Sequence, residues 1–420
     1  MRGFLKRCSC LFLAVCLAFP LNTAVGAEEG ETQDTGAEPS VWTADETTAV
    51  EAVPVAAEGA VELGEGDTAE WKVTLPQAGT YAVLLYYTAV ENKGANIGFS
   101  FAVDGEYPYE EMQNLELNRL WRSVFLDESV EINQRKPEEE EVFEESRILL
   151  SDNSGKYNMP FSFSLSAGEH TLTMSVQTEK VSIRRIALAQ TASVPTYAEY
   201  AAEHVGEQPA SAPITFEAER ASLKSNKSIL PLNDRTSPKT TPYHHSNVIY
   251  NSIGGDSWGM PGQWIEWTVD VKEAGLYCLD FRFKQSYKLN AAVYRSLYID
   301  GELPFVEAQE LEFPYASGWQ SLRLGDDSGS YQFYLSEGTH TIRLQVTTGR
   351  YAQIIEQVDA LVDRLNRVYR QILVITGISP DMYRDYEFNK LIPDTLVEMA
   401  EISAALQARD VGVYLLERVE

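Results

Sequence analysis

Residues 70–81 read EWKVTLPQAGTY and residues 266–277 read EWTVDVKEAGLY, so one block stands twice in the chain. In both copies, apolar residues alternate with polar ones ahead of an Ala-Gly pair. Alternation with a period of two is typical of a β-strand with one buried face, and a glycine after it is typical of a turn. The block therefore predicts the same strand–turn–strand unit in each half of the chain.

Two further blocks repeat in the same order. Residues 101–106 (FAVDGE) return as 297–302 (LYIDGE), and residues 161–172 (FSFSLSAGEHTL) return as 331–342 (YQFYLSEGTHTI). The Asp-Gly pairs are typical of tight hairpins between strands. The last pair of blocks is 170 residues apart and the others 196, so the first copy carries 26 extra residues between its second and third blocks. Short strands with frequent turns and no helices between them predict two tandem antiparallel β-sandwiches, a mainly β fold.

The first 27 residues have the three parts of a signal peptide: basic residues, an apolar run at 11–21, and small residues that end at Ala27. The apolar run is shorter than the ~20 residues that span a bilayer. We therefore expect an exported protein, extracellular or at the cell surface. Lipid attachment at Cys16 and a buried N-terminal helix are the alternatives.

Charge and cysteine content limit the function classes. The chain has 62 acidic and 34 basic residues and a net charge of −28. This balance argues against nucleic acid as a partner, because phosphate contacts need clustered Lys and Arg. Of the four cysteines, only Cys278 lies beyond the signal peptide, so we expect no internal disulfide and no transmembrane segment in the mature chain.

The repeats and the composition predict the domain boundaries. In chain order these are the signal peptide 1–27, an acidic spacer 28–40, sandwich module 1 at 41–191, a linker 192–212, sandwich module 2 at 213–350, and a helical segment 351–420. A short helix is predicted at 197–204. The insertion of module 1, about 122–150, holds glutamate runs at 138–141 and 144–145. Such runs predict a solvated acidic loop, with a metal site as the alternative.

The period of the apolar residues changes after Gly349. Between residues 354 and 372 it follows helical spacing, and Gly377 is a typical helix end. A second helix is predicted over residues 396–406. The apolar faces of these helices have no obvious partner within the sequence, so we expect them to lead into a further domain.

Three stretches of the second repeat resemble the galactose-binding-like jelly rolls, which include carbohydrate-binding modules of families 6 and 35. They are 216–219 (FEAE), 254–258 (GGDSW) and 261–267 (PGQWIEW). The resemblance covers residues 214–346, and the first copy more weakly. It implies two jelly-roll sandwiches, and it makes Glu217 and Glu219 ligands of a structural calcium in module 2. Two departures weaken the calcium expectation: the family's closing strand offers a further Asp whereas a helix follows Val346 here, and the first copy has no such Glu pair.

A second resemblance concerns module 2 and the tail. Residues 298–305 (YIDGELPF) and 375–386 (ITGISPDMYRDY) are similar to large extracellular solute-binding proteins of Gram-positive sugar ABC transporters. This implies a permease and solute-binding lobes as partners. Because the lobes are absent here, we expect an N-terminal part of such a protein or a chain cut short.

The predicted ligand site lies in the loops of module 2. A sugar offers an apolar face and a ring of hydroxyls, so its site needs an exposed aromatic ring with polar groups beside it. Trp258 in its glycine-rich loop is the first candidate, although packing is the alternative for any one aromatic. The predicted ligand-binding residues are Tyr243, Asn251, Trp258, Gln285, Tyr287, Arg295 and Trp319. Module 1 is poorer, because Trp121, which aligns loosely with Trp319, has no companion.

No spacing in the sequence predicts catalysis. The five histidines form no triad or zinc motif, and no carboxylate pair stands out among 62 acids. The sequence therefore predicts a non-catalytic protein that binds an oligosaccharide or polysaccharide. The alternative is a structural or partner-docking role without a sugar site.

Overall fold

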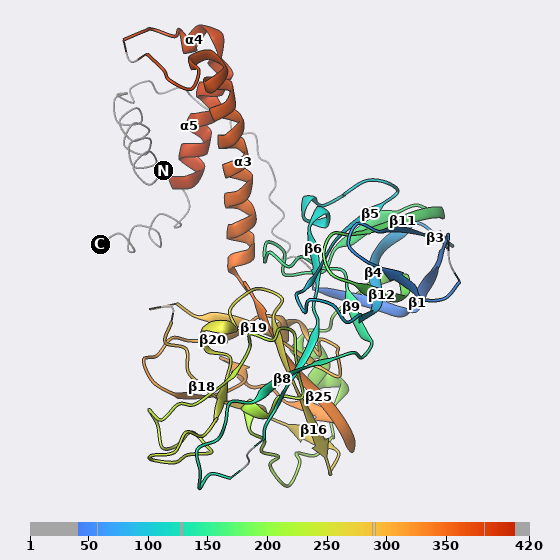
Figure 1. Ribbon diagram of the computed structural model, residues 1–420, viewed down its shortest axis with the longest axis vertical. Helices are drawn as coiled ribbons and strands as arrows, with labels where there is room; N and C mark the ends of the chain where they lie inside the picture. Colours follow the sequence, from blue (N-terminus) through green and yellow to red (C-terminus); the bar gives the residue numbers. More distant parts are fainter. Residues whose placement is uncertain are drawn as a thin grey trace. The chain divides into compact units, whose positions relative to one another are not determined.

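The computed structural model describes residues 41–56, 58–126, 129–287, 289, 291–381 and 383–407. The predicted signal peptide 1–27 and spacer 28–40 lie outside these residues, as does the end of the helical segment. The fold class is confirmed: the chain is mainly β, its sheets are antiparallel, and helices follow the strands (Figure 1).

The first module is a sandwich whose two sheets share strand β1 (Trp42–Pro54). β1 pairs with β12 (Val181–Ser193) over most of its length and with β3 (Thr68–Leu75) at its end. One sheet also contains β4 (Gly79–Ala89), β10 (Ser162–Leu165), β2 (Val61–Leu63) and β9 (Ser146–Leu149). The other also contains β11 (Gly168–Val176), β5 (Ile97–Val103) and β6 (Leu115–Leu117).

The alternating pattern that opens the repeat forms the core of this sandwich. Trp71, Val73 and Leu75 of β3 are buried, whereas Lys72 and Thr74 between them are exposed. Burying each large apolar side chain contributes roughly 1.5–3 kcal/mol. The Asp-Gly turns are also confirmed, because Asp104 and Asp300 both have φ of 53° and a left-handed glycine follows each of them.

The second module keeps one long sheet and a second layer of short strand pairs. The long sheet contains β20 (Leu311–Phe313), β19 (Val293–Ile299), β25 (Gly338–Thr347), β16 (Trp264–Val271) and β13 (Leu223–Lys224). The short pairs are β17 (Gly275–Tyr277) with β24 (Phe333–Leu335), β18 (Asp280–Phe283) with β21 (Gln320–Arg323), β14 (Pro231–Leu232) with β15 (Ser252–Ile253), and β22 (Gly325–Asp326) with β23 (Gly329–Ser330). Trp267, Val271, Phe305 and Phe333 are buried in its core.

The acidic insertion is not a solvated loop, so that prediction is wrong. It forms β7 (Leu120–Val124) and β8 (Glu138–Val142), which pair with each other and extend the long sheet of module 2 in the order β16, β13, β7, β8 (Figure 1). Successive glutamates of β8 have cationic partners: Glu139 pairs with Lys224, Glu140 with Arg122, and Glu141 with Arg119. The glutamate run is visible in the sequence, but Lys224 is distant from it, so composition alone predicts water as the partner.

Strand pairing locates the extra residues of the first repeat. β4 and β18 are equivalent at an offset of 196 residues, and their partners β9 and β21 at an offset of 174. Most of the insertion therefore lies between β6 and β9, where β7 and β8 occur. Trp319 directly precedes β21, so the loose alignment of Trp121 with Trp319 is wrong. Trp121 belongs to the inserted hairpin.

The helices begin and end close to their predicted positions. α2 (Tyr197–Glu203) begins with a capping box between Thr196 and Glu199, as a stable helix start requires. After module 2 come α3 (Tyr351–Thr376), which ends at Gly377, then α4 (Phe388–Leu391) and α5 (Pro393–Gln407). Among the described residues, no helix has the length and apolar character that a membrane span requires.

The apolar faces of α3 and α5 do have a partner, contrary to expectation, because they pack against each other. Leu361 and Val368 of α3 are buried with Ile402 of α5. Other apolar side chains of the helical segment stay exposed, and they include Val374, Ile378 and Tyr383.

Candidate functional site

Trp258, the first candidate from the sequence, is packed rather than open. It is half-buried against the core of module 2, and its indole Nε1 donates to the carbonyl of Gln263 at 3.3 Å. The Arg295 guanidinium lies 4.3 Å from the centroid of the indole ring, within cation–π range. One face of the indole is therefore covered by a side chain of the module itself.

Asn251 and Gln285 are buried and hydrogen-bonded inside their own loops. The Asn251 amide donates to the carbonyls of Asp234 and Pro242 at 2.9 and 3.0 Å. The Gln285 amide donates to the carbonyl of Ala291 at 2.6 Å. These bonds fix the loops that would surround a ligand, and the direct contact of either amide with a sugar stays a prediction.

Arg295 is held by backbone carbonyls. Its guanidinium donates to the carbonyls of Tyr294 and Trp258 at 2.8 and 3.1 Å. Its Nε is buried and has no acceptor within the described part of the chain. Burial lowers the pKa of Arg295 to about 10.

The remaining predicted residues lie on loops and are accessible to different extents. Tyr287 is 81% exposed and Tyr243 is 37% exposed. Trp319 is half-buried, and the Arg282 guanidinium lies 5.9 Å from the centroid of its ring. None of the seven predicted residues lines the pocket beside the inserted hairpin or the pocket beside α2.

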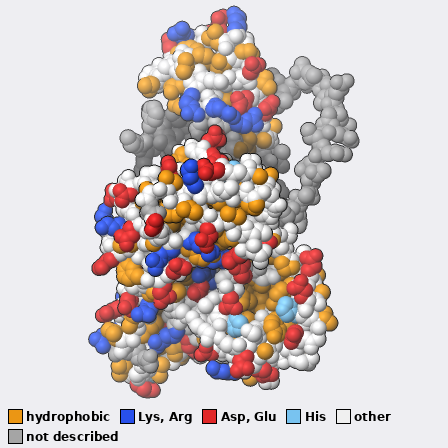
Figure 2. Space-filling model, turned by 90° about the vertical axis from the view of Figure 1, so that its right-hand side faces the viewer, with side chains coloured by type: hydrophobic (Ala, Val, Ile, Leu, Met, Phe, Trp, Pro, Cys, Tyr) orange, Lys and Arg blue, Asp and Glu red, His pale blue; other side chains and the backbone are white. Residues whose placement is uncertain are grey.

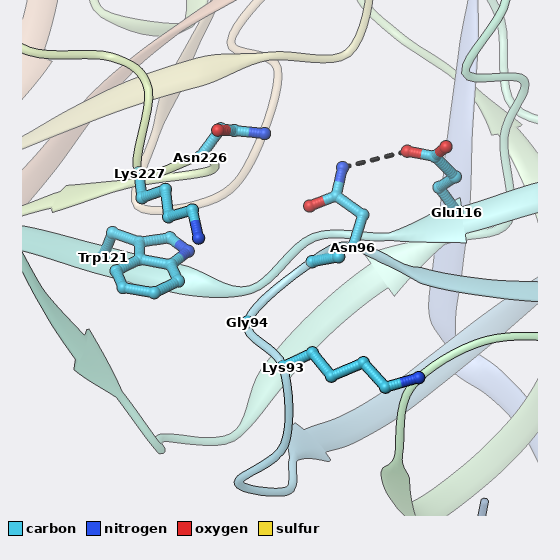
Figure 3. A pocket seen from close by; sticks show the side chains of 8 residues that line it. Lys93, Gly94, Asn96, Glu116, Trp121, Asn226 and Lys227 are labelled. Atoms are coloured by element: carbon cyan, nitrogen blue, oxygen red, sulfur yellow. Dashed lines mark hydrogen bonds between the residues drawn. The ribbon is translucent and has the colours of Figure 1, made fainter. Parts of the chain in front are cut away.

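An open pocket of about 340 Å³ lies beside the inserted hairpin (Figure 3). This volume is at the lower end of the ~300–1,000 Å³ range of ligand sites. Its lining residues come from the β4–β5 loop, from β6, from β7 and from the loop after β13, and they are Lys93, Gly94, Ala95, Asn96, Glu116, Trp121, Asn226 and Lys227.

The aromatic wall of this pocket is Trp121. The indole is 8% exposed, and the Lys227 ammonium lies 5.7 Å from the centroid of its ring. A Cβ on Gly94 would lie 3.5 Å from the six-membered ring, an ordinary van der Waals contact. The φ of +81° at Gly94 is what favours glycine at this position.

Amide and carboxylate groups form the polar wall. The Asn96 amide donates to the Glu116 carboxylate at 2.9 Å (Figure 3). Asn226 adds a second side-chain amide beyond the Lys227 side chain. The pocket thus combines an aromatic ring with amides, a carboxylate and two ammonium groups.

Two buried cations position the walls of this pocket. Arg119, which is fully buried, donates to the carbonyls of Ala95 and Val90 at 2.7 and 3.0 Å and pairs with Glu179 at 2.8 Å. These bonds tie the β4–β5 loop to the start of β7. Lys224 connects β13 to the inserted hairpin. It pairs with Glu139 of β8 and is the cross-strand partner of Trp121.

A second pocket, of about 250 Å³, lies beside α2. It is lined by Tyr197, Tyr200, Ala201, His204, Val205, Gly206, Glu207, Leu276 and Gln332. The His204 ring packs on Tyr200 with centroids 4.4 Å apart, and its Nδ1 bonds to the Tyr200 carbonyl. The Tyr200 and His204 rings of this pocket therefore contact each other, and the His204 Nδ1 is already hydrogen-bonded.

The predicted calcium ligands fit a cation in part. Glu219 is buried, one of its carboxylate oxygens has no hydrogen-bond donor in the described residues, and Glu217 is close enough to add repulsion. Burial, followed by the charge of Glu217, raises the pKa of Glu219 to about 7. No group of three or more His, Cys, Asp or Glu side chains within the described ranges could hold a metal. Further ligands would therefore have to be carbonyl or hydroxyl oxygens, or water.

No family model matches the chain, and no curated protein sequence does. Solved structures with which it aligns include a family 35 carbohydrate binding module from an environmental isolate, at 20% identity over 29% of this chain and 74% of that one, with a TM-score of 0.20. The GH26-CBM35 β-(1,4)-mannanase of Podospora anserina aligns at 12% identity over 38% of this chain and 27% of its own, with a TM-score of 0.19.

The tandem CBM22 modules of Paenibacillus barcinonensis Xyn10C align at 11% identity over 74% of this chain and 92% of that one, with a TM-score of 0.20. At TM-scores near 0.2, these likenesses carry no conclusion about what this chain binds.

Sequence reasoning missed the pocket at Trp121. Its walls come from two repeats and an insertion, and their proximity depends on the β13–β7 pairing. The one signal in the sequence is the unequal spacing of the repeats, which marks the insertion but not its destination.

Proposed function

We propose that this chain is a non-catalytic carbohydrate-binding protein that is exported and acts outside the cell. The observation that carries the proposal is the pocket that Trp121 lines together with the side-chain amides of Asn96 and Asn226. An aromatic wall packs on the apolar face of a sugar ring, and amides and a carboxylate bond to its hydroxyls. Export is supported by the basic, apolar and small-residue pattern of residues 1–27.

Binding is tested by titration calorimetry of the purified chain against a panel of neutral and acidic oligosaccharides. Saturable binding is expected, and Asn96→Ala and Asn226→Ala should each weaken it about tenfold, because each loses a hydrogen bond at the sugar. Trp121→Ala should abolish it. Trp319→Ala is the matched control, because Trp319 lies outside the pocket. If Trp319→Ala abolishes binding and Trp121→Ala does not, the ligand site is in the module 2 loops, as the sequence predicts.

We also propose that Glu217 and Glu219 hold a calcium ion in module 2. A bound cation would satisfy the free oxygen of Glu219 and offset the repulsion between the two carboxylates. Equilibrium dialysis with calcium should show one bound ion, and Glu219→Gln should remove it. Calcium retained by Glu219→Gln would place the ion elsewhere.

A second role is favoured by the exposed apolar side chains of the helical segment. Val374, Ile378 and Tyr383 are almost fully exposed. In this proposal the chain is the N-terminal part of a sugar ABC transporter's solute-binding protein, and the helical segment contacts its lobes or the permease. Cysteine crosslinking from position 378 in membranes of the native cell would join the chain to a transporter component. Crosslinking only to itself would contradict this role.

A further inference from the structure

The local charge of the Trp121 pocket is opposite to that of the whole chain. The chain carries a net charge of −28, and acidic side chains are spread over the face in Figure 2. The pocket has two ammonium groups, Lys93 and Lys227, and one carboxylate, Glu116. Fields from distant surface charges fade within about 10 Å at 0.1 M salt, so the charged groups that line the pocket set its local field.

No carboxylate in the described part of the chain pairs with Lys227. Other lysines are paired, such as Lys156 with Glu111 at 2.7 Å and Lys284 with Asp234 at 3.1 Å. Lys227 is exposed and forms no ion pair with any described residue, and its ammonium lies over the Trp121 ring. Lys93 is exposed as well, and its contact with Glu65 is long, at 3.5 Å.

We propose that the Trp121 pocket selects saccharides that carry an anionic group, a carboxylate or a sulfate. This inference rests on the proposed carbohydrate binding and adds the ligand class. The sugar lies beside the small exposed part of Trp121, and the amides of Asn96 and Asn226 bond its hydroxyls. Its anionic group binds the Lys227 ammonium.

Glu116 limits where the anionic group can lie. Its carboxylate would repel a ligand carboxylate or sulfate, and the hydrogen bond from Asn96 holds this carboxylate in place. The anionic group therefore lies on the Lys227 side of the pocket, next to the indole. This arrangement makes Lys227 the residue on which selectivity depends.

The test compares matched ligands on the full chain by calorimetry: a neutral oligosaccharide, the same oligosaccharide oxidised to a uronate, and the same one sulfated. Wild type is expected to bind at least one charged ligand about tenfold more tightly than the neutral one, as a hydrogen bond to a charged group allows. Raising the salt concentration should narrow that gap. The arm with the tighter binding identifies the group as carboxylate or sulfate.

Variants then locate the selectivity. Lys227→Gln should lose the tenfold preference, whereas Lys227→Arg should retain it. Lys272→Gln, an exposed lysine of module 2 outside the pocket, is the matched control and should change nothing. Equal binding of neutral and charged ligands would overturn the inference and leave carbohydrate binding in place. No binding of any ligand would overturn both.

Discussion

Trp121 and Lys224 are cross-strand partners on β7 and β13, although Trp121 lies in the insertion of module 1 and Lys224 opens module 2. Lys224 is fully buried, and its ammonium donates to the Ser123 hydroxyl at 2.8 Å and to the Ile229 carbonyl at 2.6 Å. It also pairs with Glu139 of β8. The buried Lys224 ammonium thus adds to the strand pairing that joins the strand of Trp121 to module 2.

Removing this cation should destabilise the protein strongly. Lys224→Met leaves the Glu139 carboxylate without its partner, and breaking a buried pair costs roughly 3–5 kcal/mol. Urea unfolding measures the loss as a lower midpoint. The same hairpin supplies the control, because Arg122 and Glu140 pair with both side chains 52% exposed, and Arg122→Ala should cost under about 1 kcal/mol.

The double variant Lys224→Met with Glu139→Leu separates the pair from packing. Replacing both partners with apolar side chains removes the unpaired charge, so most of the lost stability should return. A double variant as unstable as Lys224→Met alone would mean that the hydrogen bonds to Ser123 and Ile229, rather than the ion pair, hold the hairpin.

The sandwich strands and turns could be predicted because their signals are local. Alternation in β3 and β16, the Asp-Gly turns at Asp104 and Asp300, and the helical period of α3 all depend on neighbours within a few residues. Both repeats also carry the same signals, so each copy supports the other. These elements lie where the sequence predicts them.

The inserted hairpin and the pocket could not be predicted, because both depend on pairing between distant segments. The sequence alone predicts that the glutamates of β8 are solvated, because only the fold places Lys224 and Arg119 beside them. Trp121 lacks a companion in the sequence, since Lys227 joins it only through the β13–β7 pairing. Likewise, the sequence predicts an accessible indole at Trp258, whereas Arg295 covers one face of it in the fold.

The two modules carry equivalent histidine–aspartate pairs, and their titration should follow the pairing. His170 lies 2.7 Å from Asp104, and His340 lies 2.6 Å from Asp300. Burial lowers the pKa of each histidine, but the bonds to the aspartate and to a backbone carbonyl outweigh burial and raise it above 6.5. A raised histidine pKa stabilises the fold fully below pH 6.5, and this contribution is lost as the pH rises through the folded value.

NMR titration of the imidazole signals measures these pKa values. Asp104→Asn should lower the pKa of His170, because burial still lowers this pKa and the charged aspartate no longer raises it. The pKa of His340 should not change. Asp300→Asn should do the reverse. A variant that shifts both histidines, or neither, would contradict the role of the pairs.

Equivalent glycines of the two repeats should respond differently to alanine. A Cβ on Gly275 would lie 2.7 Å from the backbone carbonyl oxygen of Gln208, in the linker segment that pairs with Leu276. A Cβ on Gly79 would lie tightly against the end of the Gln190 side chain, at 3.0 Å, which can move, and in ordinary contact with the Tyr81 ring, at 3.5 Å. Gly275→Ala should therefore cost about 1–3 kcal/mol in urea unfolding, and Gly79→Ala less. Equal losses would show that the linker segment moves as readily as a side chain.

Glu219 should make the stability of the metal-free protein depend on pH near neutrality. Its pKa is raised to about 7 from an ordinary value of 4.5, chiefly by burial. A raised carboxyl pKa means that the folded state holds the proton more tightly, so this stabilising contribution is complete below pH 4.5 and is lost as the pH rises through 7. The melting temperature in a chelator should therefore fall between pH 5 and pH 8, and Glu219→Gln should flatten that part of the fall.

Calcium should reverse this loss, because it binds the ionised carboxylates. At a calcium concentration of 100 times the Kd, the folded state gains about 2.7 kcal/mol. The gain should be larger at pH 8 than at pH 5, where the protons on Glu219 compete with the ion. Glu337→Gln, an exposed glutamate of the same module, is the control and should keep both effects. If the pH slope survives in Glu219→Gln, another group causes it. If the slope disappears but calcium still stabilises the variant, Glu219 is a buried acid and not a calcium ligand.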